Sequence, residues 1–150
     1  MDFVKFAREY AKNACESDKN IFGERFFDQH LELAAYYGGL LADRIGADKE
    51  VVMTAAYLHD IAAIFIPDRI PEHAVLGGEM AYKILMENGA DESFARKVAD
   101  CARTHSSPVK EGEGTREQIC VSSADAMTQI PRPAYWLPYS LCKKKKPFND

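Results

Sequence analysis

The chain has 150 residues, enough to bury the core of one domain, and its composition of 47% hydrophobic and 28% charged residues is typical of a globular protein. Its 19 basic residues face 23 acidic ones, and four of the basic residues form the run 143–146, so the rest of the chain is distinctly acidic. This balance argues against a nonspecific nucleic-acid binder, which must neutralise phosphates. The most apolar stretch, residues 51–67, is interrupted by His59 and Asp60, so it does not predict a membrane span of about 20 apolar residues.

The N-terminus and the cysteines predict the cellular location. The first ten residues alternate charged and apolar side chains and show no signal-peptide pattern. Cys15, Cys101, Cys120 and Cys142 are widely spaced and form no CxxC pair, so we interpret them as reduced thiols. We therefore expect a cytoplasmic protein.

Helical periodicity runs through nearly the whole chain, and no convincing strand pattern alternates with it. Gly46 is typical of a helix C-cap, and Asp48 and Asp91 are typical N-caps. Pro67 must end the third helix, and we expect residues 67–71 and 106–115 to form loops. In chain order, the predicted helices are Phe3–Ala14, about Phe26–Arg44, residues 49–66, Pro71–Asn88, Glu92–His105, Thr115–Ile130 and a last helix beginning near Ala134 or Tyr135.

This pattern predicts an all-α protein, a single-domain bundle of about six to seven helices that spans residues 1–150. For residues 131–150 we expect a C-terminal helix and a solvated tail, with continuation of the natural chain past Asp150 as the alternative.

The four histidines fall in four different predicted helices: His30, His59, His73 and His105. Each shares its helix face with small or apolar residues, so the periodicity directs each one toward the interior. A single histidine in that position is more often a hydrogen-bonded core residue than a ligand. Four buried imidazoles are costly unless each has a partner, and one metal centre can serve several of them. The joint pattern therefore predicts a metal site.

Two carboxylates complete this set. Asp60 follows His59 within the apolar sequence AAYLHDIAAI, where an unpaired charge would be expensive and a cation is the natural partner. Asp125 lies among small residues in VSSADAMTQI, and a solvated helix face is the alternative explanation for it.

The ordered series of these residues resembles the signature of the HD-domain superfamily, which is H, then HD, then a later D, with two further histidines in some members. The surrounding sequences AAYLHDI and HAVLGGEMA are also similar to the family, and the resemblance covers about residues 26–130. It implies an HD-type helical bundle and a metal-dependent phosphohydrolase that acts on a nucleotide or another small phosphoester.

The resemblance also implies a division of roles. His30, His59, Asp60 and Asp125 would hold one metal ion, and His73 and His105 would hold a second one with Asp60 as the bridge. Asp60 and His59 would be the catalytic pair. The expected cofactor is one or two divalent ions, Mn, Fe, Ni, Zn or Mg, because the set contains no thiolate.

Candidate substrate contacts are Arg103, Lys110 and Arg116, which flank the loop after His105 and are basic enough to meet a phosphate. Each is also explained as an ordinary surface charge. The sequence HDIAAIF departs from several HD phosphodiesterases, because Ala63 and Ile64 stand where those proteins have a glycine and a basic residue. This departure argues against the cyclic-di-nucleotide phosphodiesterase group.

Two other functions stay open at this point. The same ligands in the same order resemble the mixed-valent di-iron oxygenases that share the HD fold, and a catalytically silent HD domain that binds a nucleotide or a protein is the third reading. The expected partner is a small phosphorylated molecule, with neither nucleic acid nor membrane. The aromatic residues fit either the core or the contact surface of a homodimer, and the core is the expected place.

Overall fold

A computed structural model describes residues 1–23, 25–107 and 112–131 of the chain. Within these ranges the regular structure is helical and no strand occurs, which confirms the predicted all-α class. The last predicted helix, near residues 134 and 135, lies outside the described residues. The elements in chain order are α1 Phe3–Cys15, the π-helix η1 Phe27–Leu31, α2 Glu32–Ile45, α3 Lys49–Leu58, α4 Ile61–Phe65, the 3₁₀-helix η2 Pro67–Glu72, α5 His73–Glu87, α6 Glu92–Thr104 and α7 Arg116–Thr128.

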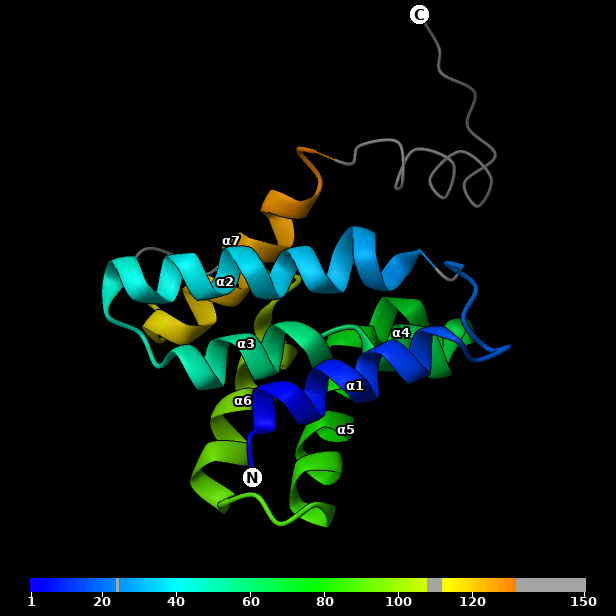
Figure 1. Ribbon diagram of the computed structural model, residues 1–150, viewed down its shortest axis with the longest axis horizontal. Coiled ribbons are helices and arrows are strands. Elements are labelled where there is room, and N and C mark those ends of the chain that lie inside the picture. Colours follow the sequence, from blue (N-terminus) through cyan, green and yellow to red (C-terminus); the bar gives the residue numbers. More distant parts are fainter. Residues whose placement is uncertain (24, 108–111, 132–150) are drawn as a thin grey trace, which may run out of the picture.

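The helices pack around one another as a bundle (Figure 1). The helix α3 is central, because it contacts α1, α2, α6 and α7, while α5 and α6 form an antiparallel pair at one end. Helix α7 packs along α2 and brings the C-terminal part of the described chain back to the middle of the bundle. The core is built largely of alanine, valine, leucine and isoleucine side chains, and small residues allow close approach of the helices.

The helix ends agree with the signals in the sequence. Asp48 and Asp91 cap α3 and α6 with their side chains, and Gly46 ends α2 with a φ of 70°, a conformation that glycine adopts without strain. Thr115 begins α7 in a capping box with Gln118. These predicted boundaries are confirmed.

The third predicted helix is wrong in one respect. The structure divides it, because α3 ends at Leu58 and α4 begins at Ile61, with Asp60 in a non-helical conformation (φ −103°, ψ 14°). Consecutive residues of an unbroken helix point about 100° apart and do not face the same site. The break allows His59 and Asp60 to face the same point. The predicted loop at residues 67–71 is also wrong, because these residues form the 3₁₀-helix η2.

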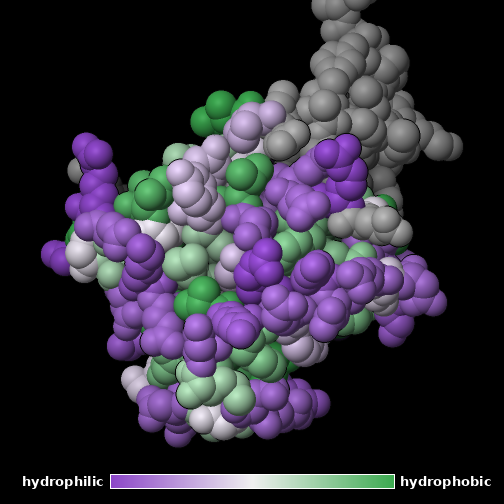
Figure 2. All heavy atoms as spheres, in the orientation of Figure 1, coloured by the Kyte–Doolittle hydropathy of each residue, from purple (hydrophilic) through white to green (hydrophobic). Residues whose placement is uncertain are grey.

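The surface differs sharply from the core. Figure 2 shows hydrophilic residues over much of the visible face, with apolar residues scattered between them. None of the helices in the described ranges combines the length and the apolar composition of a bilayer span.

Candidate metal centre

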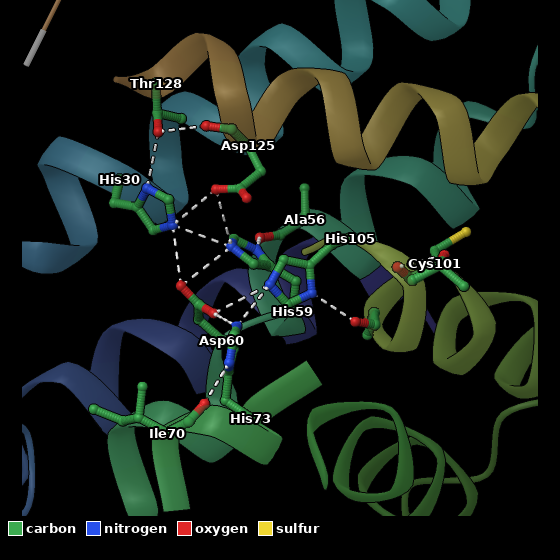
Figure 3. A network of polar contacts seen from close by, with 12 residues as sticks. His30, Ala56, His59, Asp60, Ile70, His73, Cys101, His105, Asp125 and Thr128 are labelled. Carbon is green, nitrogen blue, oxygen red and sulfur yellow. Dashed lines mark hydrogen bonds and ion pairs between the residues drawn. The ribbon is translucent and has the colours of Figure 1, made fainter. Parts of the chain in front are cut away.

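Six side chains from different helices converge at the centre of the bundle (Figure 3). They come from η1, from the turn between α3 and α4, from α5 and α7, and from the residue that follows α6. The set consists of all four histidines and two aspartates: His30, His59, Asp60, His73, His105 and Asp125. The structure therefore brings together every residue that the sequence predicted as a metal ligand.

The first group in this cluster surrounds one oxygen of Asp60. Its Oδ2 lies 3.1 Å from His30 Nε2 and 3.3 Å from His59 Nε2, and these two nitrogens are 3.0 Å apart. Asp125 Oδ1 lies 3.4 Å from the His30 nitrogen and 3.7 Å from the His59 nitrogen. Ligands held at about 2.1 Å by one ion stand roughly 3.0–3.5 Å from one another. The atoms of His30, His59 and Asp60 therefore have the spacing of a single coordination sphere, and Asp125 lies at its edge.

The second group surrounds the other oxygen of the same carboxylate. Asp60 Oδ1 lies 3.4 Å from His73 Nε2 and 3.4 Å from His105 Nε2, and these two nitrogens are 3.1 Å apart. Figure 3 shows Asp60 between the His30 side and the His73 side of the cluster. Asp60 therefore contacts both pairs of histidines, with Oδ2 near His30 and His59 and Oδ1 near His73 and His105. A ligand that bridges two ions needs this arrangement.

Each imidazole ring is oriented by a hydrogen bond from its other nitrogen. In three of the histidines, Nδ1 donates to the backbone carbonyl three residues earlier, at the C-terminal end of a helix. These bonds join His59 to Ala56 at 2.8 Å, His73 to Ile70 at 2.7 Å and His105 to Ala102 at 2.6 Å. A proton on Nδ1 leaves the lone pair of Nε2 directed into the cluster, and outer bonds of this kind are usual for metal-bound histidines.

The atoms that face one another in the cluster are electron-rich, so a cation between them would be stabilising. With their protons on Nδ1, His73 and His105 point two bare Nε2 atoms at each other, and both also face a carboxylate. Lone pairs at that distance repel one another unless a positive charge lies between them. The residues present therefore fit a divalent metal. Ligand atoms of His30, His59 and Asp125 lie within 4.8 Å of one another, and so do those of His59, Asp60 and His105, so His59 also lies close to the second group.

The pKa values of His59 and Asp60 show that the cluster stabilises positive charge. Burial lowers the pKa of His59, but the charges of Asp60 and Asp125 outweigh burial and raise it to about 9. Burial likewise opposes ionisation of Asp60, yet its histidine neighbours, His59 first, hold the pKa of that carboxyl well below its usual range. In the protein without metal, a proton on His59 therefore balances part of the negative charge.

Access to the cluster differs between its members. The His59 side chain is fully buried, and the side chains of His30 and His105 are 1% and 2% exposed. His73 and Asp125 are 22% and 19% exposed, and they belong to different groups. The centre is thus buried on most sides, and His73 and Asp125 are its most exposed members.

Two of the three predicted substrate contacts, Arg103 and Arg116, do not join this cluster. Arg103 pairs with Asp100 and lines a surface pocket with Tyr82, and it points about 200° around α6 from His105. Arg116 donates to the carbonyl of Gly46 and precedes Asp125 by nine residues, about 13 Å along α7. Lys110 lies outside the described residues.

The three cysteines in the described part of the chain do not contribute to the cluster. Burial, together with the nearby charge of Asp60, raises the pKa of Cys15 to about 12. Burial also raises the pKa values of Cys101 and Cys120, to about 12 and about 11. All three are free thiols and stay protonated at neutral pH, so they are not thiolate ligands.

Two residues with a part in the site are missing from the sequence-based prediction. Thr128 accepts the His30 Nδ1–H bond at 2.9 Å, and Gly77 lets α5 approach the backbone carbonyl of His59. The signal for Thr128 was its place three residues after Asp125, near the same face of a helix. Gly77 carried no signal beyond its position four residues after His73.

The comparisons with known proteins support the family. The family model described as HD domain matches residues 27–129, which contain all six residues of the cluster. A search of curated proteins and a search of solved structures returned no match. The chain therefore belongs to the HD domain family, whose members are metal-dependent and in general hydrolases.

Proposed function

We propose that this protein is a metal-dependent phosphohydrolase that acts on a nucleotide or another small phosphoester at a centre of two divalent ions. The observation that carries the proposal is the position of Asp60, whose two oxygens each face a different pair of histidine nitrogens. Its carboxylate would bridge the ions, His30, His59 and Asp125 would complete the first sphere, and His73 and His105 would belong to the second.

The buried residues act as ligands rather than as free acids or bases. His59 has Nδ1 bound to a backbone carbonyl and Nε2 directed into the cluster, so it has no nitrogen left for a substrate. Asp60 likewise has both oxygens engaged by histidines. We therefore interpret this predicted catalytic pair as residues that contribute to catalysis through the ions they hold.

The charge of the centre supports a phosphorylated substrate. Two carboxylates face the four positive charges of two divalent ions, so the loaded centre would be net positive and would attract a phosphate without help from an arginine. When bound, such ions polarise a phosphoryl oxygen and make a coordinated water more acidic. The protein's part is to hold the ligands in place, to keep the centre largely dry and to admit the substrate beside His73 and Asp125.

The donor set also favours certain metals. Four imidazole nitrogens suit Fe, Mn, Ni or Zn, whereas Mg prefers oxygen ligands and keeps several of its waters. Among the expected cofactors, we therefore favour a transition metal over Mg.

The test is hydrolysis of a generic phosphodiester and phosphomonoester by the purified protein loaded with Mn or Fe. The wild-type protein should release phosphate or alcohol only when metal is present. Asp60→Ala should lose more activity than the roughly 10–100-fold that removal of an outer hydrogen-bond partner costs, because both groups lose a ligand. The helix content measured by circular dichroism should stay unchanged.

The matched control is Asp43→Ala, which removes an exposed carboxylate of α2 that pairs with Lys49 away from the cluster. It should keep wild-type activity. Full activity of Asp60→Ala would contradict the proposal. Two bound irons with consumption of oxygen and no hydrolysis would also overturn it, in favour of the oxygenase alternative.

A further inference from the structure

His30 differs from the other three histidines in its place along a helix. The other three lie at or just beyond the C-terminal ends of α3, η2 and α6, and each donates from Nδ1 to the backbone carbonyl three residues earlier. His30 lies inside η1, which continues into α2 without a break. The carbonyl three residues before it, that of Phe27, accepts from the backbone N–H of Glu32. At His30 the corresponding carbonyl lies in the helix interior, and Nδ1 instead contacts a side chain.

A threonine from another helix replaces that acceptor. Thr128 Oγ1 lies 2.9 Å from His30 Nδ1 and comes from the last residue of α7, 98 positions further along the chain. The threonine is 1% exposed, so solvent does not compete for this bond. Figure 3 shows Thr128 on the far side of the His30 ring from Asp60.

A second hydrogen bond fixes the direction of the first. The Thr128 hydroxyl lies 2.7 Å from the backbone carbonyl of Asp125, and a carbonyl only accepts. The single hydroxyl proton is thus donated to Asp125, and the oxygen must accept from Nδ1–H of His30. That arrangement places the ring proton on Nδ1 and leaves the Nε2 lone pair directed at Asp60 and His59.

We propose that Thr128 is a positioning residue of the metal centre, which sets the tautomer of His30 and ties that ring to the α7 turn that carries Asp125. The inference rests on the proposed metal centre. One buried hydroxyl would then position both His30 in η1 and Asp125 in α7, and these are the two ligand-bearing elements furthest apart in the chain. The second group, built on His73 and His105, has its own backbone acceptors and does not depend on Thr128.

The test compares Thr128→Val, which removes the hydroxyl at nearly constant shape, with Thr128→Ser, which keeps it. Zinc titration by calorimetry should show one ion bound about 10–100-fold more weakly in Thr128→Val and the other ion unchanged. Thr128→Ser should restore the affinity to within a few-fold of wild type. Long-range ¹H–¹⁵N spectra of the zinc-loaded wild-type protein should show the His30 proton on Nδ1.

The control is Thr54→Val, the same change at a fully buried threonine of α3 whose hydroxyl has no hydrogen-bond partner among the residues that the structure describes. It should leave both affinities unchanged. Equal zinc affinities in Thr128→Val and wild type would overturn the inference, as would a His30 proton on Nε2 in the wild-type spectra, a result that holds even if the valine variant does not fold. Failure of wild-type protein to bind zinc, manganese or iron would instead refute the metal centre itself.

Discussion

At the scale of single residues, the atoms that face the centre are mostly hydrogen-bond acceptors, with few donors among them. Hydrogen bonds at Nδ1 commit each imidazole to present a lone pair, and two carboxylates add further acceptors to the same small volume. Such a set is expensive to bury unless positive charge enters it. A divalent ion and a proton compete for that role, so the state of the centre depends on pH.

The stability of the metal-free protein should therefore fall in alkaline solution. The pKa of His59 is raised from 6.5 to about 9, so its contribution is complete below pH 6.5 and is lost as the pH rises through about 9. The pKa of Asp60 is lowered below 3.8, so its contribution is present above pH 3.8 and is lost in stronger acid. The two contributions overlap between pH 3.8 and 6.5. Thermal unfolding of chelator-treated protein from pH 5 to pH 9 measures the effect.

Metal should reverse this trend. Binding requires unprotonated ligands, so the stabilisation by added manganese or zinc should grow between pH 6.5 and pH 9. In Asp60→Asn the alkaline loss of stability should be smaller, because the charge that contributes most to the raised pKa of His59 is gone and only that of Asp125 remains. Constant or rising stability of the metal-free wild type across this interval would contradict the account.

At the scale of elements, two local departures from regular helix position the ligands. The π-turn at Phe27–Leu31 carries His30, and the break after Leu58 turns His59 and Asp60 toward one point. π-Turns of this kind occur frequently at functional sites. A third feature is the close approach of α5, because a Cβ built on Gly77 would lie 2.7 Å from the carbonyl oxygen of His59.

Gly77→Ala should consequently damage both stability and metal binding. The added methyl meets a backbone atom that cannot rotate away, and overpacking of this kind costs about 1–3 kcal/mol. Gly39→Ala is the matched control, since its Cβ would meet the flexible side chain of Met53 at 3.2 Å. There the gain in helix propensity, about 1 kcal/mol, offsets the adjustment. Urea unfolding and zinc titration of both variants provide the measurement, and equal effects of the two would refute the role of Gly77.

The sequence predicted the helices well and their interruptions poorly. Capping residues such as Asp48 and Asp91 act locally, so their effect is visible in a few neighbouring residues. The cause of the break at Asp60 is not local. The sequence AAYLHDIAAI favours a continuous helix, and the turn depends on contacts of Asp60 with His30 and His73, which lie elsewhere in the chain. The same holds for Thr128, whose partner is 98 positions away.

At the scale of the whole molecule, the centre joins parts of the chain that are far apart. Its ligands begin at His30 and end at Asp125, and they come from η1, the turn before α4, α5, the end of α6, and α7. The six ligand-type residues were predictable because each histidine lies on an inward face and because the series resembles a known family. Whether Arg103 and Arg116 lie near the cluster was not predictable, since exposed residues carry no periodic signal of where they point.

The central claim is a centre of two ions that share Asp60, and the metal content per chain tests it most directly. Protein reconstituted with manganese or zinc and freed of loosely bound ions should contain two ions per chain. Asp125→Ala and His73→Ala should each lose one ion, because each belongs to one group only, and Asp60→Ala should bind neither ion tightly. Wild-type protein without bound metal, or Asp60→Ala with two ions, would contradict the account.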